Sequence, residues 1–510
     1  MNVSDLLGDV ASYYAGKPLL YVRGEPISHA RIDADVRKLT GWLRSRGIAR
    51  GDRVLLVMNN SAEWLVSLFA ILRVGAIVVP VNPGLKSAEM CTIATHCEPS
   101  MAIVDDEFVE YLEPLADRFP MLVRAGSGPC DWTAVVVGAE ADREATQVNA
   151  SDASMIFYTS GTTGAPKGVI ISHGAVNYIA TMTSTHMRIG RADTSLVMGS
   201  LAFIYPLAIN CLASFRGGAT VVLQERFHPK FVCEAVEMRR VTVTMGVPTM
   251  FVMLMNFGEL EQYDFSSMRL AISGGASLPD ALCRRAKDTL GFEIFDLWGM
   301  TECTPVTSYD PARDDRGVPD SCGRALPGCD FRIVDDNLRP VANGVVGEVM
   351  LTGPMIMSGY YKNPKATAET MIDGWIRSGD LGIRDDAGHL FLVGRRKDLI
   401  IRGGANVYPV EIEEVLYTHP DVAECAVIGL PDAVFGERVK AFVVRRTDRL
   451  IEQELLSHCS RTLAEYKLPS EIEFVAELPK GPTGKILRRE LRDLSTVRAE
   501  RSPSKDQGLQ

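Results

Sequence analysis

Apolar residues along the first three-quarters of the chain follow two alternating patterns. In the first, they recur every three or four positions, as on the buried face of an α-helix, and residues 32–43 are the clearest case (Ile32, Val36, Leu39, Leu43). In the second, several consecutive positions are apolar, as in a strand covered on both faces, and residues 53–58 are an example. Gly47 favours a helix end between these two segments.

The same alternation continues along the chain. Asn60, with Glu63 three residues later, predicts the cap of a helix that ends near Gly75. The pattern also predicts strands at 76–79, 220–223, 241–244 and 270–273, and helices at 229–239 and 279–290. Repeated strand–helix–strand units predict an α/β fold with stacked, mostly parallel sheets and helices on their faces.

The pattern changes from about Cys322 onward. Short strands are expected at 331–334, 347–351 and 389–393, which predicts a small β-rich subdomain. Beyond residue 398 the pattern predicts a small α+β domain, with helices at 410–417 and 451–466 and strands at 424–428, 439–444 and 471–475. We therefore expect an N-terminal domain over 1–394, a junction at 395–398, and a mobile C-terminal domain over 399–510 with a flexible tail after about 495.

Composition limits the possible functions. The chain has 510 residues, 46% hydrophobic and 23% charged, and its formal net charge is -10. These values are typical of a globular protein of more than one domain and argue against a nucleic-acid partner. The N-terminus lacks the apolar core of a signal peptide, and the uncharged stretch 198–215 is interrupted by Pro206 and Asn210, so we expect a buried segment and no integral membrane segment.

The eleven cysteines are scattered, without a CxxC pair or zinc-ligand spacing. Reduced thiols in a cytoplasmic protein are the expected state. The sequence thus offers no metal site made of cysteine and histidine.

The most informative segment is the loop over residues 158–168, Tyr-Thr-Ser-Gly-Thr-Thr-Gly-Ala-Pro-Lys-Gly, which lies between two apolar runs. Glycines let a backbone approach a phosphate closely, while hydroxyl groups and Lys167 supply donors and positive charge. The loop is not a Walker A motif, because Pro166 occupies the second glycine position and Gly168 follows the lysine. Taken alone it fits a polyphosphate grip and an ordinary flexible turn about equally well.

Four further segments decide between these readings. Trp298-Gly-Met-Thr-Glu302, Ser378-Gly-Asp380, the run 394–398 (Gly-Arg-Arg-Lys-Asp) and the run 479–485 (Pro-Lys-Gly-Pro-Thr-Gly-Lys) follow the loop in this order. Together the five resemble the motif set of the adenylate-forming superfamily, which includes acyl-CoA synthetases, firefly-type luciferases and peptide-synthetase adenylation domains. The resemblance covers nearly the whole chain and is closest to acyl-CoA synthetases.

The resemblance implies a ligase that uses ATP, Mg²⁺ and CoA. A carboxylate would attack the α-phosphate of ATP, pyrophosphate would leave, and the acyl-AMP would pass its acyl group to a thiol. Because two anions must meet, positive charge and oriented donors are needed. The loop residues implied to hold the β- and γ-phosphates are Thr159, Ser160, Gly161, Thr162, Thr163, Gly164 and Lys167.

The same resemblance assigns the nucleoside and metal contacts. Trp298, next to Gly299, would stack on adenine, Thr301 would contact the α-phosphate, and Glu302 would help hold Mg²⁺, an ion that takes few carboxylates. Asp296 matches a polar adenine contact, and Gly274, Gly275 and Ala276 match a flat backbone surface beside the base. Asp380, assisted by Arg395, matches the acid that accepts hydrogen bonds from the ribose diol.

Two lysines are implied to act through domain movement. Lys485 matches the lysine that swings in to touch the carboxylate and the α-phosphate, while Lys397 matches the hinge about which the C-terminal domain turns between half-reactions. Gly403 and Gly404 resemble the loop along which a pantetheine thiol arm passes. This loop favours coenzyme A or a carrier-protein phosphopantetheine as acceptor, and the short region 335–347, where carrier-loading relatives often have an insertion, favours CoA.

The sequence indicates less about the carboxylic acid substrate. The residues expected to line its pocket are apolar or small, and fit an uncharged hydrophobic carboxylic acid: Phe203, Ile204, Tyr205, Val247 and Met300, with Gly274 and Gly275. Phe203 stands where many acyl-CoA synthetases have histidine. The absence of an acidic residue from 197 to 215 argues against an α-amino acid, and fatty, aromatic and alicyclic acids remain open.

Two alternatives remain. An acyl-AMP ligase could stop at the adenylate or load a carrier protein. A catalytically inactive nucleotide-binding relative is disfavoured because the key residues Lys167, Glu302, Asp380, Arg395 and Lys485 are all present. A luciferase-like oxygenase also fits this superfamily, but no residue calls for it.

Overall fold

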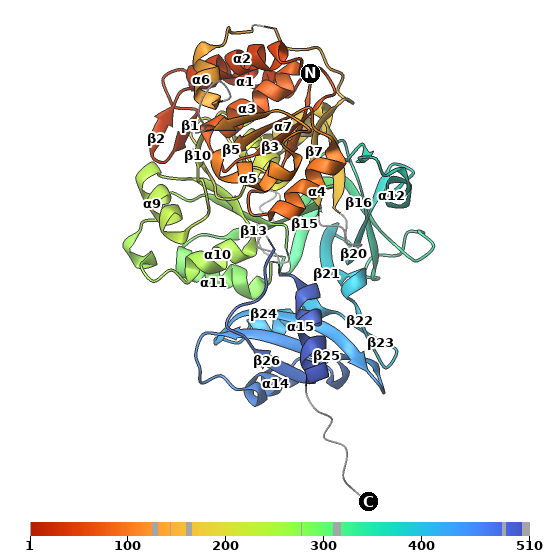
Figure 1. Ribbon diagram of the computed structural model, residues 1–510. Coiled ribbons are helices and arrows are strands. Elements are labelled where there is room, and N and C mark those ends of the chain that lie inside the picture. Colours follow the sequence, from red (N-terminus) through yellow and green to blue (C-terminus); the bar gives the residue numbers. More distant parts are fainter. Residues whose placement is uncertain are drawn as a thin grey trace, which may run out of the picture.

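The structure is a computed structural model of the chain. It describes residues 2–124, 131–142, 144–159, 166–276, 278–309, 318–481 and 486–501, with side chains to Ser495 in the last helix. Two large sheets and their helices form the upper body in Figure 1, and a smaller sheet lies below them, near the C-terminus. The mixed α/β class predicted from the sequence is confirmed.

The larger sheet has fourteen strands among the described residues. Its centre is parallel, from β1 through β10, β9, β11 and β12 to β13, and the strands beyond β13 are antiparallel. The β-rich region predicted after Cys322 therefore continues the parallel sheet. The order of the strands is β16 (Asp330–Val334), β17 (Gly347–Thr352), β20 (Trp375–Arg384), β21 (His389–Arg395), β15 (Ser321–Ala325), β14 (Cys303–Ser308), β13 (Ile294–Met300), β12 (Leu270–Gly274), β11 (Val243–Gly246), β9 (Thr194–Val197), β10 (Thr220–Leu223), β1 (Leu20–Val22) and β2 (Glu25–Ile27), with β19 (Met371–Ile372) beside β20.

The second sheet has seven described strands, parallel from β6 to β7 and antiparallel at β8 and β18. The third sheet, with five, belongs to the C-terminal part. The second consists of β18 (Gly359–Tyr360), β8 (Lys167–Ser172), β7 (Ala153–Thr159), β4 (Ile77–Pro80), β3 (Arg53–Val57), β5 (Met101–Asp105) and β6 (Met121–Arg124); the third of β23 (Ala405–Val407), β22 (Ile400–Arg402), β25 (Gly436–Arg445), β24 (Val422–Asp432) and β26 (Glu471–Phe474).

Helices cover these sheets and join them through shared cores. One large core contains residues of both big sheets together with α3 and α7, so the two sheets pack as one body. A separate core belongs to the C-terminal sheet and its helices. The main helices are α1 (Asp5–Val10), α2 (His29–Ser45), α3 (Ala62–Val74), α4 (Ser87–Cys97), α5 (Val109–Leu112), α6 (Trp132–Gly138), α7 (His173–His186), α8 (Ala213–Gly217), α9 (Pro229–Arg239), α10 (Pro248–Met255), α11 (Asp280–Leu290), α12 (Pro364–Thr370), α13 (Pro409–Tyr417), α14 (Glu452–Ser460) and α15 (Arg488–Arg501).

Most predicted elements recur within a residue or two, with a few corrections. Strand β11 begins two residues later than predicted, helix α14 ends at Ser460 and not near 466, and α15 extends past the expected start of the tail at 495. The cap of α3 is Ser61, whose hydroxyl accepts the N–H of Trp64 at 3.1 Å. Asn60 instead donates to the carbonyls of Gly199 and Gln224, each at 2.8 Å. The side chain predicted as the cap is therefore engaged in a tertiary contact.

The uncharged stretch 198–215 is buried, as predicted. It contains a π-helix, η5 (Tyr205–Leu212), followed by α8, and its residues from Leu207 to Phe215 are all nearly inaccessible to solvent. Among the described helices, none combines the length and apolar character that a membrane span requires. A π-helix is rare and often marks a functional site.

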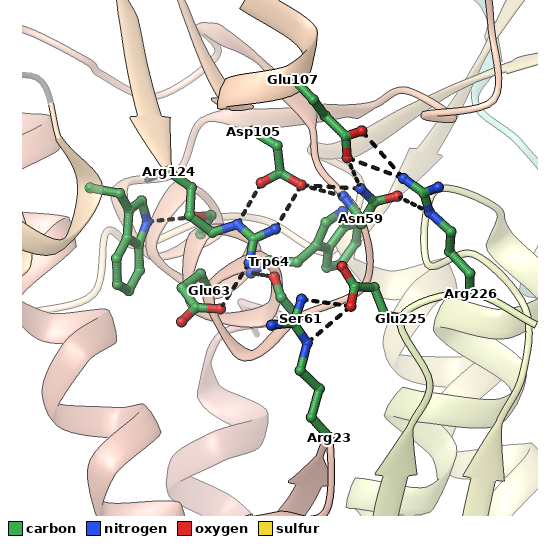
Figure 2. A network of polar contacts seen from close by, with 12 residues as sticks. Arg23, Asn59, Ser61, Glu63, Trp64, Asp105, Glu107, Arg124, Glu225 and Arg226 are labelled. Atoms are coloured by element: carbon green, nitrogen blue, oxygen red, sulfur yellow. Dashed lines mark hydrogen bonds and ion pairs between the residues drawn. The ribbon is translucent and has the colours of Figure 1, made fainter. Parts of the chain in front are cut away.

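A polar network ties the second sheet to the larger one (Figure 2). The buried carboxylate of Asp105, at the end of β5, accepts two hydrogen bonds from Arg124, at 2.5 and 2.8 Å, and one from the backbone N–H of Asn59 at 2.9 Å. The Asn59 side chain donates to Glu107, which is also paired with Arg226, a residue that follows β10 in the other sheet. The network therefore spans the carboxyl ends of strands from both sheets.

Replacing the central carboxylate should destabilise this contact. Asp105→Ala leaves the Arg124 charge and the Asn59 N–H without their acceptor, and removing one partner of a buried pair costs about 3–5 kcal/mol. Because Arg124 is about a quarter exposed, we expect a loss near ~3 kcal/mol. Urea denaturation measures it, and Asp106→Ala is the matched control, since the Asp106 side chain is exposed. Equal losses in both variants would contradict this role for the network.

Candidate active site

Several predicted site residues meet at one edge of the larger sheet. Gly274 ends β12, and Trp298 to Met300 end the adjacent parallel strand β13, with Gly274 opposite Leu297. In parallel α/β sheets, ligands bind at the carboxyl ends of the strands. Gly275, which has a positive φ of 87°, and Ala276 follow β12 and are exposed at this edge.

Trp298, Asp380 and Arg395 lie together although they are distant in sequence. The indole N–H of Trp298 donates to Asp380 Oδ2 at 3.2 Å, and Arg395 Nε lies 3.1 Å from Asp380 Oδ1. Asp380 and Arg395 are partners across β20 and β21, so strand register brings the arginine to the carboxylate. An indole face beside a buried, oriented carboxylate suits a nucleoside, whose base can stack and whose diol can donate hydrogen bonds.

Asp296 lies two residues before Trp298 on β13 and is half-buried. Its Oδ1 accepts the N–H of Leu297 at 2.9 Å. Burial raises the pKa of Asp296 to about 7, against the opposing effect of hydrogen bonds from Cys322 and Leu297. A cavity of about 250 Å³ opens beside Asp296 and is also lined by Phe295 and Tyr309.

The phosphate loop is described only at its two ends. Thr159 on β7 and Lys167 on β8 are partners in register, so a hairpin holds the two ends together. Ser160, Gly161, Thr162, Thr163 and Gly164 lie outside the described residues. The ammonium of Lys167 lies 4.9 Å from the centre of the Tyr360 ring.

Thr301 and Glu302 form the tight turn between β13 and β14. Met300 and Cys303 are partners on the two strands, and a Cβ atom at Gly299 would lie 2.7 Å from Thr304 Oγ1, so the turn requires glycine there. The buried Glu302 carboxylate accepts the hydroxyl of Tyr360 at 2.7 Å through Oε1. A single oriented carboxylate fits Mg²⁺, which shares its coordination with phosphate oxygens and water.

Tyr360 was not predicted as a site residue. It lies on the two-residue strand β18, which pairs with Val169 and Ile170 of β8. A lone tyrosine carries no sequence signal of its own. The strand pairing that brings it to Lys167 and Glu302 links residues almost two hundred positions apart, which periodicity cannot predict.

The predicted acyl-pocket residues lie around the start of the π-helix. The Tyr205 hydroxyl is 3.2 Å from the carbonyl oxygen of Ile272, within β12, and 3.4 Å from that of Gly246, the last residue of β11. A Cβ atom at Gly274 would lie 3.2 Å from the Tyr205 ring, so the ring packs directly on this glycine. Ile204 is buried, and Phe203, Val247 and Met300 are half-buried.

The predicted hinge lies between two anchored residues. Arg396 is paired at 3.2 Å with the buried Glu348, on β17, and at 2.6 Å with Asp336, which follows β16. Asp398, on the other side of Lys397, accepts a hydrogen bond from Arg492 of α15 at 3.0 Å. The exposed Lys397 therefore separates a residue held by the larger sheet from one held by the C-terminal helix.

Gly403 and Gly404 form the turn between β22 and β23. Both have positive φ values, 59° and 84°, which suit glycine, and the Gly403 N–H donates to the carbonyl of Phe435 at 2.7 Å. Lys485 lies outside the described residues. Its loop is closed at the base, because Lys480 and Ile486 form an isolated bridge and Leu487 N–H donates to the carbonyl of Pro479 at 2.8 Å.

Comparison with known proteins relates the chain to AMP-binding enzymes. Residues 8–361 match the family model "AMP-binding enzyme", and residues 411–485 match "AMP-binding enzyme C-terminal domain". The chain is 33% identical to the indoleacetate–CoA ligase of Aromatoleum aromaticum, over 97% of this chain and 98% of that protein. It is 34% identical to the long-chain-fatty-acid–CoA ligase of Salmonella typhimurium, over 96% of this chain and 94% of that one.

A solved structure with the same architecture is the anthranilate CoA ligase AuaEII in complex with anthranoyl-AMP. Its TM-score to this chain is 0.92, at 29% sequence identity, and the match covers 98% of both chains. The similarity thus extends over both the large and the small part of the fold.

The raised pKa of Asp296 predicts a pH-dependent cost to stability. An aspartate in an unfolded chain titrates near pH ~4, whereas Asp296 keeps its proton to about pH 7. Between these values the native state binds more protons than the unfolded state, so the free energy of unfolding contributed by Asp296 falls as pH rises. Asp296→Asn removes this titration, and its gain in melting temperature over the parent should therefore grow from about pH 4 to about pH 7.

Asp330→Asn is the matched control for this measurement. Asp330 also accepts the N–H of the next residue, Phe331, at 2.8 Å, but its side chain is exposed. Because this carboxylate is in contact with water, the variant measures what the Asp→Asn change itself does across the same pH range. A difference for Asp296→Asn that stays constant with pH would contradict the prediction.

Proposed function

The chain belongs to the AMP-binding enzyme family, and we propose that it activates a compact hydrophobic carboxylic acid with ATP and transfers the acyl group to coenzyme A. It is an adenylate-forming enzyme close to acyl-CoA synthetases, an acid–thiol ligase that works through acyl-AMP. The observation that carries the proposal is the grouping of a nucleoside-type cluster, Trp298, Asp380 and Arg395, with a phosphate-type cluster, Lys167 and Glu302, around one strand end.

The first half-reaction divides between these clusters. We propose that Trp298 stacks on adenine while Asp380, oriented by Arg395, accepts the ribose hydroxyls. Lys167 and the loop before it would hold the β- and γ-phosphates, and Thr301, in the turn after β13, would donate to the α-phosphate. Glu302 would hold Mg²⁺, which when bound neutralises charge on the phosphate oxygens.

The approach of the substrate carboxylate to the α-phosphate is opposed by electrostatic repulsion. Two anions repel each other, so a cation delivered between them lowers the barrier more than it stabilises either reactant. We assign this role to Lys485. The closed base of its loop, at Lys480 and Ile486, and the helix α15 that follows support a lysine carried by the C-terminal domain as a unit.

The transfer step requires a different arrangement of the same domain. Arg396 is tied to Glu348 and Asp398 to Arg492, so backbone rotation at Lys397 would turn the C-terminal sheet with little change within either part. This supports Lys397 as the hinge and the division of the chain at 395–398. The Gly403–Gly404 turn, which has no side chains, would let the thin thiol arm of CoA pass. The phosphopantetheine of a carrier protein is the alternative acceptor of the acyl group.

The pocket geometry supports a compact acid over a long chain. Tyr205 reaches the carbonyls of Gly246 on β11 and Ile272 on β12 and packs on Gly274, so its ring covers these two adjacent strands. A flat ring beside the adenylate would fit against this phenol, whereas a long alkyl chain would require it to move. We therefore propose an aryl-containing acid as the substrate class, with the uncharged residues Phe203, Ile204, Val247 and Met300 around it.

A panel of carboxylic acids tests the proposal. With ATP and Mg²⁺, we expect aryl acids such as phenylacetate, cinnamate and benzoate to release pyrophosphate faster than dodecanoate, and mass spectrometry to detect the acyl-CoA when CoA is present. Acyl-AMP that accumulates in the presence of CoA, but transfers to a holo-carrier protein, would favour the carrier-protein alternative. No pyrophosphate release with any acid would contradict the reaction itself.

Two Tyr205 variants test whether this side chain limits the length of the acyl group that the pocket accepts. Tyr205→Ala opens the space at the ends of β11 and β12 and should raise kcat/KM for dodecanoate relative to cinnamate by about tenfold, or ~1.4 kcal/mol. Tyr205→Phe keeps the ring in place and should keep the preference for the aryl acid. An unchanged preference in Tyr205→Ala would contradict the role of this side chain.

Variants of the two lysines should separate the half-reactions. Lys485→Ala removes the mobile charge and should slow adenylation at least ~100-fold, about 2.7 kcal/mol, while CoA transfer from supplied acyl-AMP stays largely intact. Lys397→Pro restricts the backbone of the hinge and should impair transfer more than adenylation. Pyrophosphate release and thioester formation are measured separately for each. Equal loss of both steps in Lys397→Pro, or normal pyrophosphate release in Lys485→Ala, would overturn the assignment concerned.

A further inference from the structure

Tyr360 joins the two halves of the phosphate-type cluster. It is buried on strand β18, where it is the partner of Val169, two residues after Lys167 on β8. Its backbone N–H donates to the hydroxyl of Thr367 on α12 at 2.9 Å. Strand pairing on one side and a helix on the other thus fix the position of this tyrosine before any ligand binds.

The hydroxyl of Tyr360 orients Glu302. It donates to Glu302 Oε1 at 2.7 Å, within a buried environment. This hydrogen bond engages one oxygen of the carboxylate and therefore holds the plane of the group. With the plane held, the direction of the second oxygen, Oε2, is also set.

The ring of Tyr360 supports Lys167. The ammonium lies 4.9 Å from the ring centre, which is within the range of a cation–π interaction. Such a contact localises a flexible side chain and limits its reach. A single aromatic residue therefore contacts the cationic group of β8 with its face and the carboxylate of the β13–β14 turn with its hydroxyl.

We propose that Tyr360 is a positioning residue that sets the spacing between the metal-binding carboxylate of Glu302 and the phosphate-binding ammonium of Lys167. The inference rests on the proposed function, which assigns Glu302 to Mg²⁺ and Lys167 to the phosphates. In this role Tyr360 touches neither the acid nor the reacting atoms. It matches the site to a magnesium-bound triphosphate by holding two opposite charges at a fixed separation.

Nucleotide binding without chemistry tests the inference. The dissociation constant of an ATP analogue with a non-cleavable α–β bridge is measured by calorimetry with and without Mg²⁺, on the full chain. In Tyr360→Phe, which loses only the hydroxyl, the gain in affinity on adding Mg²⁺ should shrink about tenfold, while binding without Mg²⁺ stays the same. In Tyr360→Leu, which also loses the aromatic face, binding without Mg²⁺ should weaken by about three- to tenfold as well.

Two controls separate positioning from general damage. Tyr361→Phe removes the hydroxyl of the adjacent tyrosine, which donates to the carbonyl of Cys97 at 3.5 Å, and should leave both constants unchanged. In a Glu302→Gln background, Tyr360→Phe should have almost no further effect on the Mg²⁺ gain, because the two residues act through one carboxylate.

The outcomes distinguish the inference from the proposed function. If the parent chain gains no affinity from Mg²⁺, the assignment of Glu302 to the metal is wrong. If the parent gains affinity and Tyr360→Phe gains equally, or if Tyr361→Phe loses as much, the role of Tyr360 is overturned. A gain that is reduced in Tyr360→Phe but not in Tyr361→Phe, with unaltered binding of the metal-free analogue in both, supports it.

Discussion

The pairing of β18 with β8 is the constraint on which the geometry of the site depends. The chain leaves the larger sheet after β17, contributes two residues to the edge of the second sheet, and returns through α12 to β19 and β20. Backbone hydrogen bonds from Ser358 to Ile170 and from Tyr361 to Gly168, at 2.8 and 2.7 Å, secure this excursion. Lys167 belongs to the second sheet and Glu302 to the larger one. Their separation is therefore fixed by how this short strand joins the two sheets.

The elements that the sequence predicted well are those determined by local pattern. The buried strands of the parallel sheets are short apolar runs, and helices such as α2 and α9 show their apolar face at every turn, so their bounds follow from periodicity. Local pattern was insufficient to predict which of two adjacent polar residues caps a helix. Asn60 and Ser61 both suit a helix cap, and the choice of Ser61 depends on Gly199 and Gln224, which only the tertiary fold brings near Asn60.

The residues of the candidate site also fall into two groups, those that local sequence pattern indicates and those that only tertiary contacts bring together. Residues within contiguous motifs, such as Trp298 to Glu302, could be proposed from the sequence because several unusual residue types stand together. The contact of Trp298 with Asp380 and the pairing of Asp380 with Arg395 agree with the grouping predicted from the motifs. Tyr360 could not be predicted, because its importance comes entirely from non-local pairing. Likewise, the packing of Tyr205 on Gly274 depends on where a π-helix places its ring, which no spacing rule foresees.

The charges of the site explain why part of the machinery would need to move. Arg395 is engaged with Asp380, and the Glu302 carboxylate lies in the turn after β13, within a chain whose formal net charge is -10. A triphosphate and a carboxylate together add further negative charge to this edge. Lys167 offsets part of it, and a bound magnesium ion would offset more. A permanently placed additional cation would favour adenylation but would also hold pyrophosphate and the adenylate after the bond has formed. The proposed rotation of the C-terminal domain about 395–398 would avoid this cost, because the charge of its lysine would be present while two anions meet and absent when the thiol must approach.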